Sequence, residues 1–250
     1  MAQSILIVKY KLPLTRGEIF RKLDSKKFKK KYRDENNPDK EIELEHEISK
    51  LKNNTFGVEG HIRYQYQKEN EFKGEGIYDI TDEEFTFLFD PSANLVILHG
   101  NPQFRVRLMK FFADVLHAGD DLFDGITIKK EKMNDLMYKI LKMNSNKNNL
   151  EEAKFYHYDK PLGNLKKLSF TTVPDFCGTQ HELFKIHYHN CTHWGCVLRV
   201  YKCNGILDTP SDNGYLLRLN KDATISFGVD RSLKEWNRFV VETMKPVLEF

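Results

Sequence analysis

The segment from His187 to Cys196 gathers side chains that bind metals or carry protons. It reads His-Tyr-His-Asn-Cys-Thr-His-Trp-Gly-Cys, so three imidazoles and two thiols fall within ten residues. An extended strand repeats every two residues, which would bring alternate side chains to one face. The candidate ligands are His187, His189, Cys191 and His193, followed by Cys196. Imidazole and thiolate together suit zinc, so the segment predicts a zinc site as one alternative.

The spacing also weighs against a metal. Same-face residues of a straight strand lie about 6.6 Å apart, too far for more than two of them to share one tetrahedral ion without a turn or bulge. A turn near Asn190 would supply that bend or destroy the alignment, and Cys177, His181 and Cys203 are available as further ligands. The usual closed zinc motifs pair their ligands two to four residues apart, twice over, and this segment does not. We therefore expect no cofactor, with zinc as the alternative.

A second group of residues indicates a polyanion. Six cations fall within the eight residues from 26 to 33, and Phe28 and Tyr32 lie among them. They are Lys26, Lys27, Lys29, Lys30, Lys31 and Arg33. Lysine and arginine neutralise phosphates, so this run is a candidate nucleic-acid contact. The alternative is an ordinary solvated helix end or loop.

Two further sets of cations are candidates for the same role. In a strand, Arg63 shares a face with Gln65 and Gln67, opposite the tyrosines at 64 and 66. A helix that begins at Asn101-Pro102 would carry a basic face beside its apolar stripe. The residues of that basic face are Arg105, Arg107 and Lys110. Each set is equally compatible with a solvated surface.

The composition limits the class of protein to which these residues belong. The 250 residues are 40% hydrophobic and 30% charged, as in a globular protein with a sizeable core. A net charge of +3, from 39 basic and 36 acidic residues, does not by itself indicate a nucleic-acid binder. There is no apolar run of about 18 residues and no signal-peptide pattern, so we expect a cytoplasmic protein, nuclear if eukaryotic, without a membrane partner.

The elements that position the candidates are mainly antiparallel strands and amphipathic helices. The first half predicts a strand over residues 4 to 10, a helix over 16 to 23, a meander over 55 to 98 with strands at 56–67, 73–80, 85–89 and 95–98, and a helix over 102 to 117. The second half predicts a strand at 125–129, a helix at 133–143, strands at 153–158, 167–173, 183–189, 196–202, 215–219 and 224–227, and a helix at 233–248. Trp236 falls on the core stripe of that last helix, whereas Trp194 is expected near a hairpin turn and exposed.

The two halves share the plan strand, helix, meander, helix. The clearest correspondence is between residues 87 to 117, which begin Phe-Leu-Phe-Asp, and residues 216 to 248. This plan resembles the saddle of TATA-box-binding-protein-like proteins, which is also used by ring-shaped recombination-associated DNA-binding proteins and by some kinetochore subunits. The resemblance implies one curved sheet, helices on its convex back, and a concave face or edge that contacts DNA or a partner protein. The paired phenylalanine wedges that kink DNA in that family have no counterpart, so minor-groove kinking is not expected.

The sequence thus predicts an α+β fold of tandem half-domains, residues 1–120 and 121–250, packed as one unit around one curved sheet. The expected function is non-catalytic nucleic-acid binding, of DNA rather than RNA, through a basic sheet face or rim. One alternative is a subunit that binds a protein partner or a second copy of itself through sheet edges. The other is a metal-dependent enzyme centred on residues 181 to 196.

Overall fold

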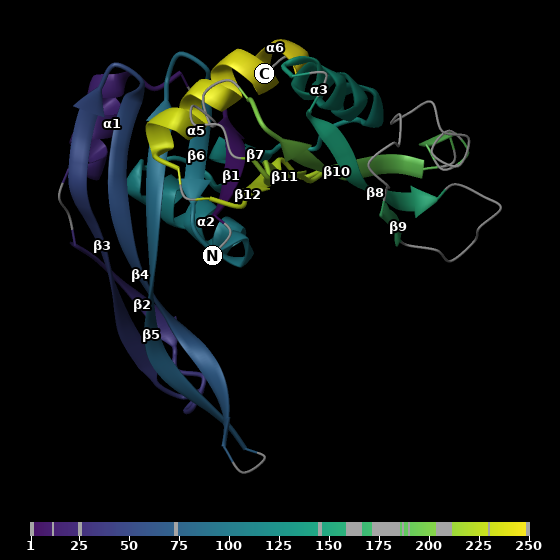
Figure 1. Cartoon of the computed structure of the whole chain (residues 1–250). Coiled ribbons are helices and arrows are strands. Elements are labelled where there is room, and N and C mark those ends of the chain that lie inside the picture. The colour runs from purple at the N-terminus through teal and green to yellow at the C-terminus, as the bar shows by residue number, and fades with distance from the viewer. Residues whose placement is uncertain are drawn as a thin grey trace.

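The computed structural model describes residues 3–248, apart from 12, 25–26, 73–74, 145–146, 159–166, 172–185, 187, 190, 204–211 and 230. The fold is α+β, as predicted, and is built on one large antiparallel sheet (Figure 1). None of the helices in the described ranges combines the length and apolarity needed to cross a membrane.

The first half of the chain supplies strands and helices in quick succession. They are β1 (Gln3–Tyr10), α1 (Arg16–Leu23), β2 (Lys27–Arg33), β3 (Glu41–Asn54), β4 (Gly57–Phe72), β5 (Glu75–Asp90), β6 (Leu95–His99), the short 3₁₀ turn η1 (Pro102–Phe104) and α2 (Arg105–Val115). Local sequence explains the helix starts. Thr15 caps α1 in a capping box with Glu18, and Asn101 with Pro102 opens η1.

The second half follows a similar order. Its elements are η2 (Asp120–Leu122), β7 (Phe123–Gly125), α3 (Lys130–Lys142), β8 (Asn149–Tyr158), β9 (Lys167–Thr171), β10 (Cys191–Val200), β11 (Tyr215–Leu219), β12 (Thr224–Phe227), α5 (Leu233–Phe239), the π-helical segment η4 (Val240–Met244) and α6 (Lys245–Leu248). Ser232 caps α5 in a second capping box with Glu235.

The halves join through β1, which lies inside the sheet. The strand order in the described part is β2-β3-β4-β5-β6-β1-β12-β11-β10-β8-β9, and β7 pairs with the end of β1. Strand β1 pairs antiparallel with β6 on one side and with β12 on the other. The predicted single sheet is therefore confirmed. In the second half β10 pairs with β8 rather than with β9, so the strand order there departs from the chain order.

Helices cover both faces of the central strands, which corrects the expectation of a single covered face. Along β1, Leu6 and Val8 belong to a core that contains α1 and α2. Ile5 and Ile7, on the other face, belong to a core that contains α3 and α5. Alternation along a buried strand sends neighbouring side chains to opposite faces, and both sets are apolar here. Figure 1 shows α5 lying across the front of the sheet and α2 behind it.

Several predicted elements differ in extent. The strands expected at 73–80 and 85–89 form the single strand β5, because its partner β4 is equally long and runs beside it from Val58 to Phe72. The short strand expected at 125–129 lies earlier, at β7. The helix expected at 233–248 contains the π-helical segment η4. Residues 42 to 51, whose pattern is compatible with either a strand or a helix, are part of β3.

The outer parts of β4 and β5 leave the sheet as a two-stranded arm. Pairing of β3 with β4 ends at Arg63, and pairing of β5 with β6 begins at Thr86. Between these limits the described residues of β4 and β5 pair with each other. The arm projects away from the helices, and the hairpin of β2 and β3 runs beside its base (Figure 1).

Candidate nucleic-acid interface

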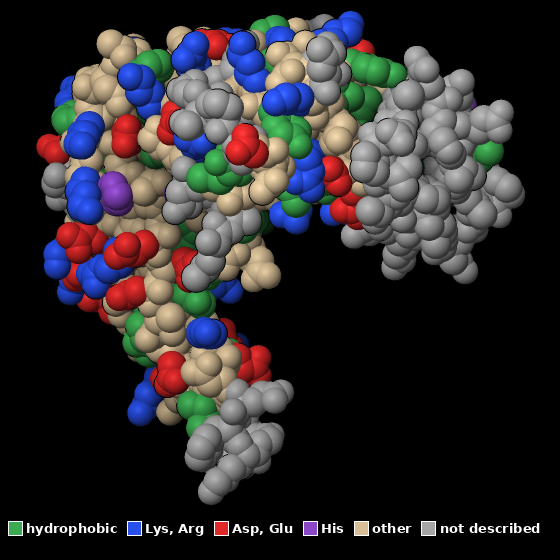
Figure 2. Space-filling model, in the orientation of Figure 1, with side chains coloured by type: hydrophobic (Ala, Val, Ile, Leu, Met, Phe, Trp, Pro, Cys, Tyr) green, Lys and Arg blue, Asp and Glu red, His purple; other side chains and the backbone are tan. Residues whose placement is uncertain are grey.

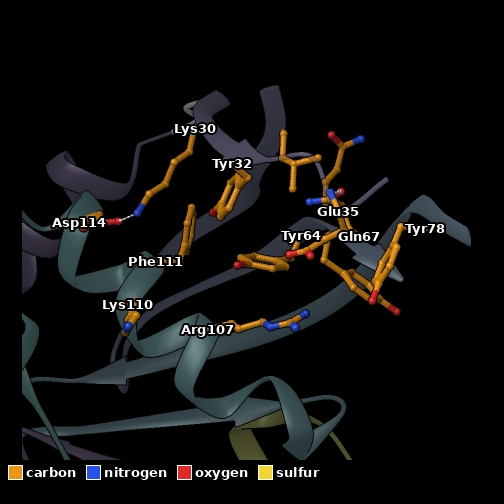
Figure 3. A pocket seen from close by; sticks show the side chains of 13 residues that line it. Lys30, Tyr32, Glu35, Tyr64, Gln67, Tyr78, Arg107, Lys110, Phe111 and Asp114 are labelled. Atoms are coloured by element: carbon orange, nitrogen blue, oxygen red, sulfur yellow. Dashed lines mark hydrogen bonds and ion pairs between the residues drawn. The ribbon is translucent and has the colours of Figure 1, made fainter. Parts of the chain in front are cut away.

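A recess of about 390 Å³ lies between α2 and the strands β2 to β5, where the arm begins (Figure 3). Its lining combines aromatic rings, amides and charges. The lining residues are Lys30, Tyr32, Glu35, Leu44, Tyr64, Gln65, Tyr66, Gln67, Tyr78, Arg107, Lys110, Phe111 and Asp114. We call this recess the tyrosine cleft. Its size falls within the range of about 300–1,000 Å³ that small-ligand sites occupy.

The tyrosine cleft opens because β3 and β4 separate. Beyond Arg63 the side chains of Gln65 and Gln67 replace the missing ladder. The Gln65 side-chain oxygen accepts a hydrogen bond from the Glu45 N–H at 2.9 Å. The Gln67 side chain accepts from the Glu35 N–H at 2.8 Å and donates to the Arg33 carbonyl at 2.7 Å. These bonds hold the β2–β3 hairpin at the cleft while satisfying backbone groups that would otherwise lack partners.

The floor of the tyrosine cleft is a packed aromatic cluster. The imidazole of His46 stacks on Tyr64, with 4.2 Å between ring centroids and 14° between planes. Phe111 meets both rings edge-on, at 5.4 Å from His46 and 6.1 Å from Tyr64. Edge-to-face and stacked contacts of this kind stabilise beyond the area that they bury. The floor is therefore rigid before any ligand arrives.

Hydrogen bonds fix the protonation of His46. The Gln65 N–H donates to Nδ1 at 3.3 Å, so Nδ1 carries no proton in this arrangement. The proton of the neutral ring then lies on Nε2, which donates to the Tyr32 hydroxyl oxygen at 3.1 Å. Burial, assisted by the charge of Lys30, lowers the pKa of His46 to about 4. His46 is thus a neutral structural imidazole at neutral pH.

The phenol of Tyr64 beside it also stays protonated. Burial raises the pKa of Tyr64 above its ordinary value, and the neighbouring Tyr32 raises it further. A neutral phenol presents an uncharged aromatic face and a hydroxyl that donates or accepts. The floor therefore offers aromatic surface and hydrogen bonds without negative charge.

The cations of the tyrosine cleft come from α2. The Arg107 guanidinium lies over Tyr66, 5.6 Å from the ring centroid, and over Phe104 at 5.4 Å. Arg107 and Lys110 are exposed, and in the described part of the chain neither forms an ion pair with a carboxylate. Lys30, from β2, is paired with Asp114 at 2.5 Å. Two cations of α2 thus line the tyrosine cleft without a carboxylate partner in the described part of the chain. Figure 3 shows Arg107 extending below Tyr64, with Lys110 farther along the helix.

The lysine run proved to be the edge strand β2, not a helix end or a loop, and Lys26 lies outside the described residues. Its outward lysines form ion pairs with glutamates of β3, at 3.0 Å for Lys27–Glu45, 2.8 Å for Lys29–Glu43 and 3.2 Å for Lys31–Glu41. The Arg33 side chain donates to the Pro38 carbonyl at 2.9 Å. Each of these ion pairs joins diagonal neighbours of the antiparallel ladder, in which Lys29 lies opposite Glu45 and Lys31 opposite Glu43. Most of the run is therefore already neutralised.

The other predicted cations divide between the tyrosine cleft and the rest of the surface. Arg63 lies within 3.5 Å of three carboxylates. These belong to Glu45, Glu47 and Asp82. Arg105 does not line the tyrosine cleft, and its guanidinium lies against Gly125. Acidic and basic side chains consequently interleave over this part of the surface (Figure 2).

The histidine and cysteine segment is only partly described. His187 lies outside the described residues, and the side chain of His193 does too. Of the strand expected at 183–189, the described residues Ile186, Tyr188 and His189 are helical instead, and β10 begins at Cys191, ahead of the strand expected at 196–202. Cys191 and Cys196 are buried. No cluster of three or more metal-ligand side chains occurs among the residues that the structure describes.

Cys191, Cys196 and Trp194 are all core residues, and their positions are explained by burial. The Cys191 thiol donates to the Tyr188 carbonyl at 3.5 Å, and burial raises the pKa of Cys196. Trp194, expected to be exposed, is fully buried and donates from its indole N–H to the Lys130 carbonyl at 3.0 Å. The hydrogen bond of Trp194 therefore joins β10 to the start of α3.

Comparison with known proteins adds no family to these observations. No family model matches the chain, and no curated protein matches it significantly.

The sequence indicated some of the tyrosine cleft and missed the rest. Arg107, Lys110 and Lys30 were candidates, and the alternation of Tyr64 with Tyr66 was visible. The neighbours that it did not indicate are His46, Phe111, Tyr78, Glu35 and Asp114. The spacing within β3 gives no signal that the ring of His46 stacks on a tyrosine of β4. That contact depends on the separation of β3 from β4.

Proposed function

We propose that this chain binds single-stranded nucleic acid in the tyrosine cleft. The observation that carries the proposal is the placement of Arg107 and Lys110 opposite a wall of tyrosines, with no carboxylate paired to either in the described part of the chain. Proteins that bind single strands combine cations that follow the phosphates with aromatic rings on which bases stack.

The two parts of a nucleotide match two parts of the tyrosine cleft. The exposed guanidinium and ammonium of α2 supply donors and positive charge for a phosphate. Tyr66 and Tyr78, both half-buried, offer ring surface at the open side, whereas Tyr64 is buried in the floor. A base stacked on the half-buried rings would leave its phosphate within reach of α2.

Shape favours a single strand over a duplex. The recess is bounded by α2 on one side and by the β2–β3 hairpin on the other (Figure 3). A base can enter it only when unstacked and unpaired, which a single strand allows at little energetic cost. The outward lysines of β2 are already paired with glutamates, so they offer little to a duplex backbone.

The charges along the arm restrict the path of the strand. Glu69, Asp79 and Glu83 lie on β4 and β5 beyond the tyrosine cleft. Their charge repels phosphates, so the strand should leave the cleft across α2 and not along the arm.

The test is fluorescence anisotropy with a labelled oligothymidylate of about 15 nucleotides, near the site size of single-strand binders, and a duplex of equal length across a salt series. The variant R107Q/K110Q removes the two unpaired cations, and K27Q/K29Q removes two paired ones as the matched control. We expect single-strand binding to weaken at least about tenfold in R107Q/K110Q, with a shallower salt slope, and to change less than about threefold in the control. Absence of binding at low salt, or equal losses in both variants, would contradict the proposal.

A further inference from the structure

We infer that the free edge of β5 on the arm is a docking surface for a cationic protein segment, which adds to the arm as a third strand. The surface consists of Ile80, Asp82 and Glu84 with the carboxylates beside them. It is separate from the tyrosine cleft and does not depend on nucleic-acid binding. The inference rests on three independent features: open backbone groups, an excess of negative charge, and the way in which the neighbouring edges are closed.

The direction of the backbone groups follows from one residue. Both the N–H and the carbonyl of Tyr78 bond to the side chain of Asn36, each at 2.7 Å. The backbone of Tyr78 therefore points away from β4. Backbone direction alternates along an antiparallel strand, so the N–H and carbonyl groups of Ile80, Asp82 and Glu84 also point outward.

Those outward groups have no partner in the described part of the chain. Strand β6 reaches only to Thr86, and outside the ladders no backbone hydrogen bond between described residues involves Ile80 to Glu84. The open stretch is about 17 Å long at about 3.3 Å per residue. Partner strands commonly bind to open edges of this length through main-chain hydrogen bonds.

The other edges near the arm are closed. The amide side chains of Gln65 and Gln67 occupy the inner edge of β4. Asn36 closes β5 at Tyr78. The exposed edge strand β2 carries lysines, a common protection against unwanted pairing. The edge from Ile80 to Glu84 has no lysine or proline, and Ile80 is 56% exposed.

The charge of this edge indicates the charge of the partner segment. Residues 64 to 85 contain seven acidic residues and two lysines, a net charge of −5, although the whole chain carries +3. The one arginine at the base, Arg63, lies near three carboxylates and faces a fourth, Glu84, across the strand pair. Several like charges beside one cation repel one another, and a cationic strand would relieve that repulsion. An acidic partner would add to it.

The probe is an acetylated, amidated heptapeptide with the sequence Lys-Val-Lys-Val-Lys-Val-Lys. Its control replaces the central valine by proline, which keeps the charge and removes strand formation. The full-length chain is titrated with each peptide, and heat release by calorimetry reports binding.

Three variants distinguish strand pairing at the β5 edge from non-specific electrostatic attraction of the peptide. I80P removes one outward N–H and leaves the inner ladder with β4 intact, and proline is tolerated at strand edges. D82N/E84Q removes two charges at the edge, and E131Q/D212N removes two exposed charges away from the arm as the matched control. Circular dichroism and urea unfolding confirm that each variant folds.

We expect the alternating peptide to bind at least about tenfold more tightly than its proline control, and at least about tenfold more weakly to I80P and to D82N/E84Q than to E131Q/D212N. Equal binding of the two peptides, or equal loss in all charge variants, would overturn strand addition in favour of diffuse attraction. A change of about tenfold or more in peptide binding to the cleft variant R107Q/K110Q would overturn the separation of the two surfaces. No binding at low salt would overturn the docking surface itself.

Discussion

The imidazole of His46 lies flat against the ring of Tyr64, at 4.2 Å between centroids, just beyond the point where their strands stop pairing. Where the hydrogen-bonded ladder between β3 and β4 ends, the two rings are in contact instead. The Gln65 N–H donates to the His46 ring and not to a backbone carbonyl. The separation of β3 from β4 thereby creates the tyrosine cleft without leaving this donor unsatisfied.

The first prediction concerns pH. An unfolded histidine titrates near about 6.5, whereas His46 in the fold titrates at about 4. Between these values the unfolded chain binds the proton and the folded chain does not, so the free energy of unfolding falls as pH falls from about 6.5 towards 4. From about pH 7 to about pH 5 we expect this residue to account for a loss of about 2 kcal/mol.

Urea unfolding of the wild type and of H46Q at both pH values measures that loss. Glutamine retains a side-chain acceptor and does not titrate, so the difference between the two pH values should shrink by about 2 kcal/mol in H46Q. Equal pH dependence in the two proteins would contradict the assignment to His46.

The second prediction concerns Tyr66, whose ring is half-buried below Arg107. Stacking of one base on an aromatic ring contributes about 1–3 kcal/mol, so Y66A should weaken oligothymidylate binding about 5- to 150-fold. Y66F keeps the ring and should bind within about threefold of wild type. An oligothymidylate with abasic sites should show little difference between the wild type and Y66A. If Y66A binds as well as Y66F, the base does not stack at this position.

The sequence predicted the scaffold better than the tyrosine cleft because regular elements follow local rules. The α1 helix begins and ends where apolar spacing predicts, and α2 follows Asn101-Pro102 as expected. Both helices expose one polar side and bury one apolar stripe, and that pattern can be read from the sequence.

Contacts between segments that are distant in the chain do not follow local rules, so the sequence did not predict them. The lysine run looks the same in a sequence whether it is free or paired, and its partners lie 10 to 18 residues away on β3. The expectation that Trp194 is exposed failed for the same reason, because the acceptor of its indole N–H lies 64 residues earlier, at Lys130. Pairing register and burial decide both cases, and neither has a local signature.

The third prediction tests that burial. W194F keeps an aromatic ring beside Phe155, whose centroid lies 6.1 Å from that of Trp194, but removes the hydrogen bond to Lys130 and leaves unfilled volume. We expect a loss of about 2–4 kcal/mol in the free energy of unfolding. The surface control V106A, at a position 64% exposed, should change it by less than about 0.5 kcal/mol. Iodide should also fail to quench Trp194 in the native protein, and strong quenching would contradict its burial.

The fourth prediction compares two glycines with opposite surroundings. Gly57 has φ of +151°, and a Cβ there would lie 1.8 Å from the Phe89 carbonyl oxygen, so β4 and β5 approach each other as only glycine allows. Gly17 lies in α1, where an added Cβ would meet no heavy atom within 4 Å. We expect G57A to lower the free energy of unfolding by more than about 2 kcal/mol, because backbone must move. G17A should raise it by up to about 1 kcal/mol, because alanine favours the helix and restricts the unfolded chain. Urea unfolding of both variants measures these changes. A neutral G57A would mean that the backbone of the turn between β3 and β4 moves without cost and that the close approach to Phe89 does not require glycine.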